Sequence, residues 1–225
     1  MLYSTYYHKD TNEDNKTSAI FENLMLLPDN IFWTIIRQSC FSGENLPQIS
    51  GILLSCDFWP HWDYKETKNK RYVEPDVFIR FQQFDVIIEA KYGDMGGQYL
   101  QQWRNEVTAY LNEYKEDNKD LFFIAIGGNT NLIAETIKVH EKEVPVIKCT
   151  WLSLLMSITK YQRQLINITM PDHTLLAQKR LLDNIKLAFN INGVYDIKWF
   201  GDLANNNTAI NPNSINILKN KYQYE

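Results

Sequence analysis

The stretch PDVFIRFQQFDVIIEAKYGDMGGQYLQQ, residues 75–102, contains two β-rich runs that are separated by a very short connection. The first run is VFIRF at 77–81 and the second is DVIIEAK at 85–91, with residues 82–84 between them. Runs rich in β-branched and aromatic residues that are joined so briefly are typical of an antiparallel hairpin. We therefore predict a β-hairpin, followed by a glycine-containing loop and a helix.

The second run ends with an acid and a base on one face of the strand. Because side chains two residues apart share a face, Glu89 and Lys91 point the same way and Ala90 points the other way. Asp76 precedes the first run, so the hairpin brings its carboxylate to the end where Glu89 lies. Buried charges are costly unless they are paired or hold a metal. The pattern predicts either an ion pair between Glu89 and Lys91 or a metal site, and the apolar, core-like strand favours the metal site.

The order of these residues resembles the PD-(D/E)XK nuclease superfamily, which has the restriction-endonuclease-like fold. The resemblance rests on Pro-Asp at 75–76, on Glu-Ala-Lys at 89–91 and on the glutamine-rich segment at 98–102. It implies an α/β fold with an αβββαβ core over about residues 13–160, in which a mixed central sheet is flanked by helices.

The same resemblance implies roles for individual residues. Asp76, Glu89 and the Ala90 carbonyl would bind Mg²⁺ or Mn²⁺, which prefer hard oxygen ligands. Lys91 would orient the attacking water or neutralise the scissile phosphate. Several families of the superfamily carry a glutamine on the helix that follows, and its position matches Gln98, which would steady Lys91 or the phosphate.

Residues 98–115 have apolar side chains at helical spacing and predict an amphipathic helix. Gln98 and Gln102 are one turn apart, so they share a face near the start of that helix. If the preceding loop is shorter, Gln101 or Gln102 takes the position that the resemblance gives to Gln98. Surface glutamines without a role are the competing interpretation.

An additional acid is expected from the first helix. Residues 17–27 have helical spacing and predict a helix that Asp14 or Asn15 caps. Glu22 lies in the middle of this helix and Glu13 just before it, and either acid could reach the hairpin. The pentapeptide EDNKT, which starts at Glu13, resembles an E-N-x-x-T pattern of the superfamily that adds a glutamate near the metal, with Asp14 in place of the Asn. This resemblance favours Glu13.

Hydrophobic periodicity predicts the remaining elements. The predicted strands are residues 48–58, 121–126 and 144–151, and the predicted helices are residues 31–40, 131–141, 152–161 and 173–190. The leucine repeats of the last helix are typical of a lid on the core or of a dimer face. The chain is thereby divided into a nuclease-like core at 1–165, a C-terminal helical extension at 166–204 and a flexible tail at 205–225.

The loop between the first strand and the hairpin contains Trp59 and Trp62. Tryptophans in such a loop either cap the hydrophobic core or form a stacking platform for nucleic-acid bases. The sequence alone leaves both interpretations open.

Composition limits the class of protein. The chain has 225 residues, of which 44% are hydrophobic, so it can bury a sizeable core. Its apolar runs are shorter than the roughly 20 residues of a membrane helix, and its start lacks the pattern of a secretory signal. Cys40, Cys56 and Cys149 are far apart in sequence, which is typical of reduced thiols. We therefore expect a cytoplasmic protein with no membrane partner.

The net charge of −4 bears on nucleic-acid binding. Neutralisation of phosphates is the main sequence-independent source of affinity for nucleic acid, so an autonomous DNA binder would usually be more basic. This charge suggests that a partner subunit or a homo-oligomer supplies part of the binding groove.

The resemblance, taken with these limits, implies a divalent-metal-dependent endonuclease that hydrolyses phosphodiester bonds in DNA, with DNA favoured over RNA. By analogy with the superfamily, we expect an effector of a restriction or anti-phage defence system. The alternative function is a non-catalytic nuclease-fold module that binds nucleic acid or a partner protein.

Overall fold

The computed structural model describes residues 12–166 and 172–196. Contacts divide the chain into a unit of residues 1–195 and a second unit of residues 196–225. The sheet and the helices belong to the first unit. Among the described residues, no helix is long and apolar enough to cross a lipid bilayer.

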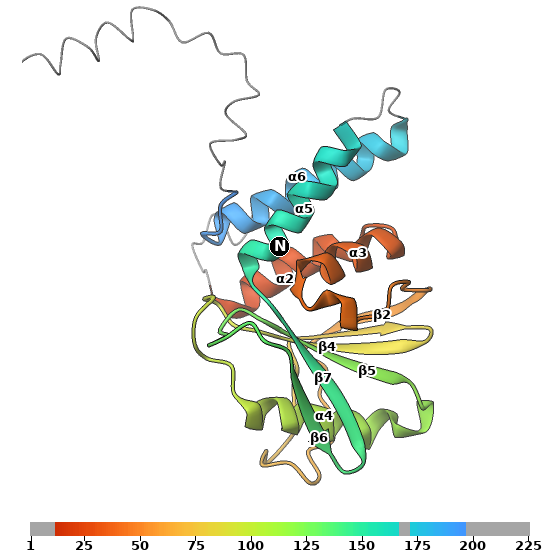
Figure 1. Cartoon of the computed structure of the whole chain (residues 1–225), viewed down its shortest axis with the longest axis vertical. Coiled ribbons are helices and arrows are strands. Elements are labelled where there is room, and N and C mark those ends of the chain that lie inside the picture. The colour runs from red at the N-terminus through yellow and green to blue at the C-terminus, as the bar shows by residue number, and fades with distance from the viewer. Residues whose placement is uncertain (1–11, 167–171, 197–225) are drawn as a thin grey trace, which may run out of the picture. The chain divides into compact units, whose positions relative to one another are not determined.

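The first unit is built on a mixed seven-stranded sheet (Figure 1). The strands are β1 (Cys40–Phe41), β2 (Leu53–Phe58), β3 (Val77–Phe81), β4 (Phe84–Ala90), β5 (Asp120–Ile126), β6 (Glu135–Val139) and β7 (Lys142–Cys149). Their order is β1-β7-β5-β4-β3-β2, and β6 pairs with β7. The predicted hairpin is confirmed as β3 and β4, which are antiparallel, whereas β4 is parallel to β5 and β5 to β7.

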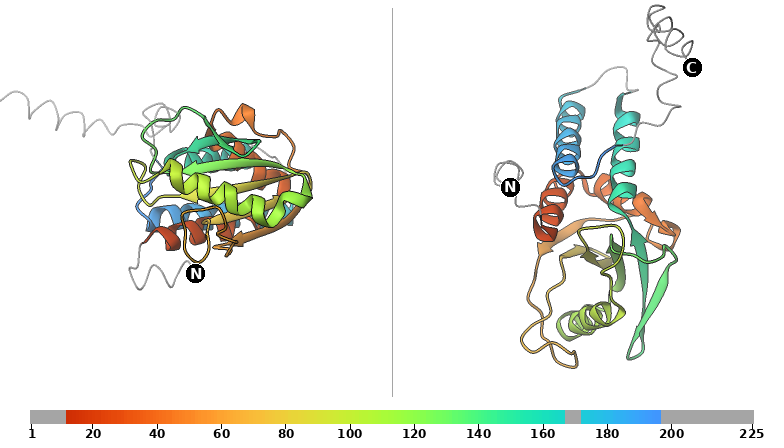
Figure 2. Two further views of the ribbon diagram at one scale, coloured as in Figure 1. Left: turned by 90° about the horizontal axis from the view of Figure 1, so that it is seen from below. Right: turned by 90° about the vertical axis from the view of Figure 1, so that its left-hand side faces the viewer.

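Helices cover both faces of the sheet, as predicted. The helices are α2 (Glu13–Leu24), α3 (Asp29–Ser39), α4 (Leu100–Tyr114), α5 (Trp151–Ile166) and α6 (His173–Ile191), with short 3₁₀ turns η1 (Gly43–Asn45) and η2 (Lys115–Asp117). α2, α3, α5 and α6 lie on one side of the sheet and α4 on the other (Figures 1 and 2). In the view from below, α4 lies in front of the strands (Figure 2, left).

The alternation of side chains along β4 separates two hydrophobic cores. Val86, Ile88 and Ala90 belong to the core that contains residues of α2, α3, α5 and α6. Ile87 belongs to the core that contains residues of α4. All seven residues of β4 are buried, because β3 and β5 flank this strand and helices cover both faces. Glu89 shares its face with Ile87, so the strand directs this acid toward α4.

The first helix begins earlier than predicted. α2 starts at Glu13, and the side chain of Asn12 caps it by accepting the N–H of Asn15 at 2.8 Å. The predicted caps, Asp14 and Asn15, are therefore wrong. An asparagine at this position satisfies an N–H group that the helix leaves unpaired, and the acids at 13 and 14 favour the positive end of the helix dipole.

The predicted helix at 131–141 is wrong, because this segment forms β6 and a turn. Ile137 and Val139 are buried and the residues between and before them are exposed, which is the two-residue period of a strand. β6 pairs antiparallel with β7, and His140 turns the chain with a left-handed φ of 52°. His140 is therefore not a helix cap, and its ring lies 3.2 Å from a carboxylate oxygen of Glu66.

The helix at 173–190 is confirmed as α6. Its buried residues Leu182, Ile185, Ala188 and Phe189 belong to the same core as α2 and α3. The tail at 205–225 lies outside the described residues, and the division into core, extension and tail stays a prediction. The three cysteines are free thiols in the structure.

Candidate metal centre

The register of the hairpin places Asp76 beside the end of β4. Val77 is paired with Ile88 in the antiparallel hairpin, so Asp76, which precedes Val77, lies opposite Glu89, which follows Ile88. A carboxylate oxygen of Asp76 accepts the backbone N–H of Ala90 at 2.7 Å. Asp76 is 8% exposed and Glu89 is 1% exposed, so both acids are nearly removed from water.

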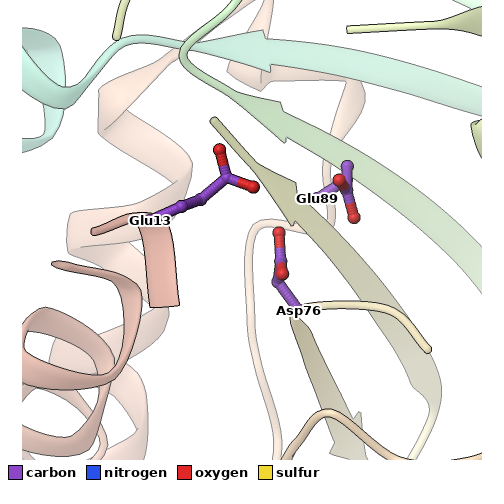
Figure 3. A group of neighbouring side chains, drawn as sticks. All are labelled: Glu13, Asp76 and Glu89. Carbon is purple, nitrogen blue, oxygen red and sulfur yellow. The ribbon is translucent and has the colours of Figure 1, made fainter. Parts of the chain in front are cut away.

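Glu13 reaches the same place from the first turn of α2. Its Oε2 accepts the backbone N–H of Tyr92 at 2.9 Å, which fixes the carboxylate next to the end of β4. Carboxylate oxygens of Glu13, Asp76 and Glu89 lie within 4.8 Å of one another, and the three side chains converge (Figure 3). We call these three residues the acidic cluster. Glu22 is exposed on α2 and is not part of it.

Lys91 lies against the acidic cluster. Its Nζ forms an ion pair with Glu89 and lies 3.3 Å from Oε1 of Glu13. Burial lowers the pKa of Lys91, but the charges of Glu89, Glu13 and Asp76 outweigh burial and leave the pKa raised above its usual value. Lys91 is therefore cationic at neutral pH. With the three carboxylates ionised, the group of four side chains carries two negative charges in excess.

Burial and the neighbouring charges change the pKa values of Asp76 and Glu89. Burial, and then the negative charge of Glu89, raise the pKa of Asp76 to about 8. Burial also raises the pKa of Glu89, although Lys91 opposes this shift. Without a further positive charge, Asp76 and Glu89 retain protons at a pH where ordinary carboxyls are ionised.

Gln98 contacts the backbone around the site, whereas Gln102 contacts the Glu89 carboxylate. The side-chain amide of Gln98 donates to the carbonyls of Glu89 at 3.0 Å and Gly127 at 3.2 Å, and its oxygen accepts the indole N–H of Trp103 at 2.7 Å. Gln98 therefore holds the main chain around the site, and its contact with Lys91 or a phosphate stays a prediction.

Gln102 is half-buried on α4 and Gln101 is exposed, and their hydrogen-bond partners differ accordingly. The amide of Gln102 donates to Oε1 of Glu89 at 2.6 Å. Gln101 is exposed and donates to Asn105 at 3.0 Å. Of the three glutamines considered from the sequence, Gln102 is thus the one that touches a carboxylate of the acidic cluster.

Glu106 is a buried acid that the sequence analysis missed. It is 1% exposed on α4, one turn after Gln102, and burial and the charge of Glu89 raise its pKa well above the usual value. Oε2 of Glu106 and Oε2 of Glu89 are both buried, and neither has a hydrogen-bond donor among the described residues when both acids are ionised. If Glu106 is protonated, its hydroxyl can donate a hydrogen bond to the Glu89 carboxylate, which reduces the repulsion between the two acids.

Asp85 is a second buried acid on β4, and its hydrogen-bond partners differ from those of Glu89. Asp85 is fully buried at the start of the strand, and its two oxygens accept hydrogen bonds from Arg80, Lys119 and Tyr110 at 3.1–3.4 Å. Asp85 has cationic partners on each oxygen. Glu89, at the other end of β4, has an oxygen that finds a donor among the described residues only if Glu106 carries a proton.

Lys91 packs closely against two glycines, Gly127 and Gly128. Gly127 and Gly128 both have left-handed φ angles, of 66° and 61°. A Cβ on Gly128 would lie 2.7 Å from the carbonyl oxygen of Gly96 and 2.7 Å from Cγ of Lys91. The glycine pair, predicted as a turn, therefore also allows the close approach that fixes Lys91.

The tryptophans of the loop have different environments. Trp62 is 3% exposed and packs edge-on against Phe78 in the core beneath α4. For Trp62, the core-capping interpretation is confirmed and the stacking platform is wrong. Trp59 is half-buried, and its backbone N–H donates to the carbonyl of Asp76 at 3.2 Å.

The structure also has a cavity of about 670 Å³ that the acidic cluster does not line. It lies between the end of α4, η2 and the β6–β7 turn, with Tyr110, Tyr114, Lys119 and His140 in its walls. The acidic cluster lies outside this cavity, at the ends of β3 and β4.

Comparisons with known proteins give limited information about this chain. No protein-family model matches it. It is similar to the uncharacterized protein PM0110 of Pasteurella multocida (strain Pm70), with 29% identity over 203 residues that cover 86% of this chain and 75% of that protein. It is also similar to a chain in a structure of Thermococcus gammatolerans McrB AAA+ hexamers with bound McrC, with 13% identity and a TM-score of 0.28. This second match covers 63% of the present chain but spans only 30% of the other, and a likeness this weak supports no argument about fold or function.

Proposed function

We propose that this protein is a divalent-metal-dependent nuclease of the PD-(D/E)XK superfamily that hydrolyses phosphodiester bonds in DNA. The observation that carries the proposal is the convergence of Glu13, Asp76 and Glu89 with Lys91 at the ends of two neighbouring strands. The element order supports it, because α2, β2, β3, β4, α4 and β5 follow the αβββαβ order that the superfamily resemblance implies, with α3 and β1 inserted after α2.

The donor set fits a hard divalent cation. The acidic cluster supplies carboxylate oxygens from three different elements, which is the ligand type that Mg²⁺ and Mn²⁺ prefer. Together with Lys91 the cluster has an excess of two negative charges, which a divalent ion would balance. The buried Oε2 of Glu89 has no hydrogen-bond donor among the described residues unless Glu106 carries a proton. Asp76, Glu89 and Glu13 would hold the ion, and the resemblance adds the Ala90 carbonyl.

Each residue of the site would have a distinct task. When bound, the metal ion would stabilise negative charge on the reacting phosphate and lower the pKa of the attacking water. Lys91 has a raised pKa, so it is suited to neutralising phosphate charge and not to removing a proton. Gln102 orients the Glu89 carboxylate through its hydrogen bond, and Gln98 fixes the backbone on which Glu89 lies. Cleavage within a restriction or anti-phage defence system of the cytoplasm, with a partner subunit or a second copy completing the groove, is the context we propose.

The ion pairs of Lys91 favour one alternative, a non-catalytic module of the same fold. Lys91 contacts both Glu89 and Glu13, and such pairs can neutralise buried acids without any metal. One ammonium balances one carboxylate, however, and Asp76 has no cationic group within hydrogen-bond distance among its described contacts. A divalent ion would replace the protons that burial otherwise keeps on Asp76 and Glu89, and the convergence of three carboxylates therefore favours the metal-dependent enzyme.

Glu13 and Glu22 provide a matched pair of acids on α2 that tests the proposal. We expect Glu13→Gln to reduce Mn²⁺-dependent DNA cleavage by about tenfold or more, because one charged ligand is lost from the site. Glu22→Gln should cleave as the unaltered protein does, because Glu22 is exposed and outside the acidic cluster. The measurement is the cleavage rate of labelled DNA in Mg²⁺ and in Mn²⁺. Absence of cleavage by the unaltered protein, or equal cleavage by Glu13→Gln, would contradict the assignment.

A further inference from the structure

One face of α4 leads from the buried acids to the surface. Glu106 is 1% exposed and Gln102 is half-buried, and both side chains contact Glu89. Tyr99 is the N-cap residue of α4, and its carbonyl accepts the backbone N–H of Gln102 at 3.0 Å. The residue is 66% exposed. Tyr99 therefore lies at the start of α4, one turn before the residue that contacts Glu89, and the proposed reaction gives it no task.

A second aromatic residue adjoins the acidic cluster on the side of Asp76. Trp59 follows β2 and binds the backbone of Asp76 through its N–H at 3.2 Å. It has a left-handed φ of 48°, which is rare and strained for a bulky side chain and is found preferentially at functional sites. Its indole Nε1 is buried and has no hydrogen-bond acceptor among the described residues.

Tyr92 adds a third ring beside the site, and its backbone is fixed. Its N–H donates to Glu13 and its carbonyl accepts Nζ of Lys16 at 2.7 Å. The Tyr92 ring is 41% exposed on a main chain that is held on both sides. Nζ of Lys16 lies 4.9 Å from the centroid of the Tyr92 ring. A tyrosine ring is suited to stacking because its two rotatable bonds leave little side-chain entropy to be lost.

We propose, building on the nuclease function above, that the site acts on nucleic acid whose bases are unpaired at the point of cleavage, with Tyr99 and Trp59 as the principal stacking residues. Every base has a flat face that an aromatic ring can cover, whereas a continuous duplex keeps these faces stacked inside. The net charge of −4 makes phosphate attraction a weak source of affinity for this chain, and stacking supplies affinity that does not depend on net charge.

Cleavage of three matched substrates tests this inference. The substrates are a fluorescein-labelled oligonucleotide, the same strand in a full duplex, and the same duplex with a single-stranded gap, each incubated with Mn²⁺. We expect the unpaired and gapped substrates to be cut at least about tenfold faster than the full duplex. Tyr99→Ala should remove about tenfold of this advantage, the loss that follows from one stacked base, and Tyr99→Phe should keep it. Tyr195→Ala is the control, because Tyr195 is 64% exposed but lies beyond α6.

A binding measurement separates failure of this inference from failure of the nuclease proposal. Fluorescence anisotropy with the Asp76→Asn variant and Mg²⁺ reports affinity without requiring cleavage. Tighter binding of the unpaired strand that Tyr99→Ala weakens supports the inference even if no substrate is cut, in which case only the nuclease proposal fails. Equal cleavage and equal binding of duplex and unpaired strand, with no effect of Tyr99→Ala, overturn the inference and leave the nuclease proposal intact.

Discussion

Replacing Asp76 with asparagine should reduce DNA cleavage by about a thousandfold or more and leave the fold intact. Asparagine keeps an oxygen that can accept the N–H of Ala90, the contact that Asp76 makes at 2.7 Å. It removes the negative charge that we assign to metal binding, and loss of metal-assisted charge stabilisation of several kcal/mol corresponds to a rate change of this size. The measurement is the single-turnover cleavage rate at saturating Mn²⁺.

Asp57→Asn is the matched control for this variant. Asp57 is exposed on β2, the strand next to β3, and its carboxylate accepts a hydrogen bond from the Ser55 hydroxyl at 2.8 Å. We expect the control to cleave at the unaltered rate. Cleavage by Asp76→Asn within about tenfold of the unaltered protein would show that Asp76 has no essential part in the reaction.

The stability of the metal-free protein should fall as the pH rises from about 6 to about 9. The pKa of Asp76 is raised to about 8 in the folded protein and is near 4 in the unfolded chain. Between these values the folded state binds more protons than the unfolded state, so the free energy of unfolding decreases with pH. We expect a loss on the order of 2 kcal/mol, seen as a lower Tm in thermal unfolding with a chelator present.

Divalent metal should reverse this dependence. An ion that binds only the folded, deprotonated site stabilises the protein by about 2.7 kcal/mol at one hundred times its Kd. Added Mn²⁺ should therefore raise the Tm at pH 9 and have little effect at pH 6, where a proton occupies Asp76. Asp76→Asn should flatten the pH profile of the chelated protein. A profile that is the same for both proteins would show that Asp76 titrates normally.

The hairpin and its acids were predictable because their signals are local. The period of two in β4 orients Glu89 and Lys91, and a two-residue connection between β3 and β4 fixes where Asp76 lies. The helix that carries Glu13 was predicted too late by four residues, since the cap is at Asn12. The superfamily pattern nevertheless favoured Glu13 over Glu22, and the structure brings Glu13 into the acidic cluster.

Glu106 was missed because the sequence does not show what an α4 residue faces. Trp103, Val107 and Tyr110 are buried on α4, and Glu106 falls within their helical spacing. A charged residue inside an apolar stripe was the available signal. Contact between Glu106 and Glu89 depends on how α4 crosses the sheet, which periodicity does not report.

The segment at 131–141 was mispredicted for a different reason. Its few apolar residues fit a helix and a strand about equally well, and such short runs are decided by their partners. β7 supplies an antiparallel edge for β6, and this long-range pairing outweighs local preference. The burial of Trp62 likewise depends on a contact that periodicity does not report, the packing of its ring against Phe78 of β3.

Calorimetric titration of the metal-free protein with Mn²⁺ at pH 8 tests the central claim most directly, namely that Glu13, Asp76 and Glu89 form a cage for a divalent cation. The account predicts saturable binding accompanied by proton release, because the carboxyls must lose their protons to hold the ion. Asp76→Asn should weaken this binding by about tenfold or more, and Asp57→Asn should not. No detectable heat of binding, or the same affinity in Asp76→Asn as in the unaltered protein, would contradict the account.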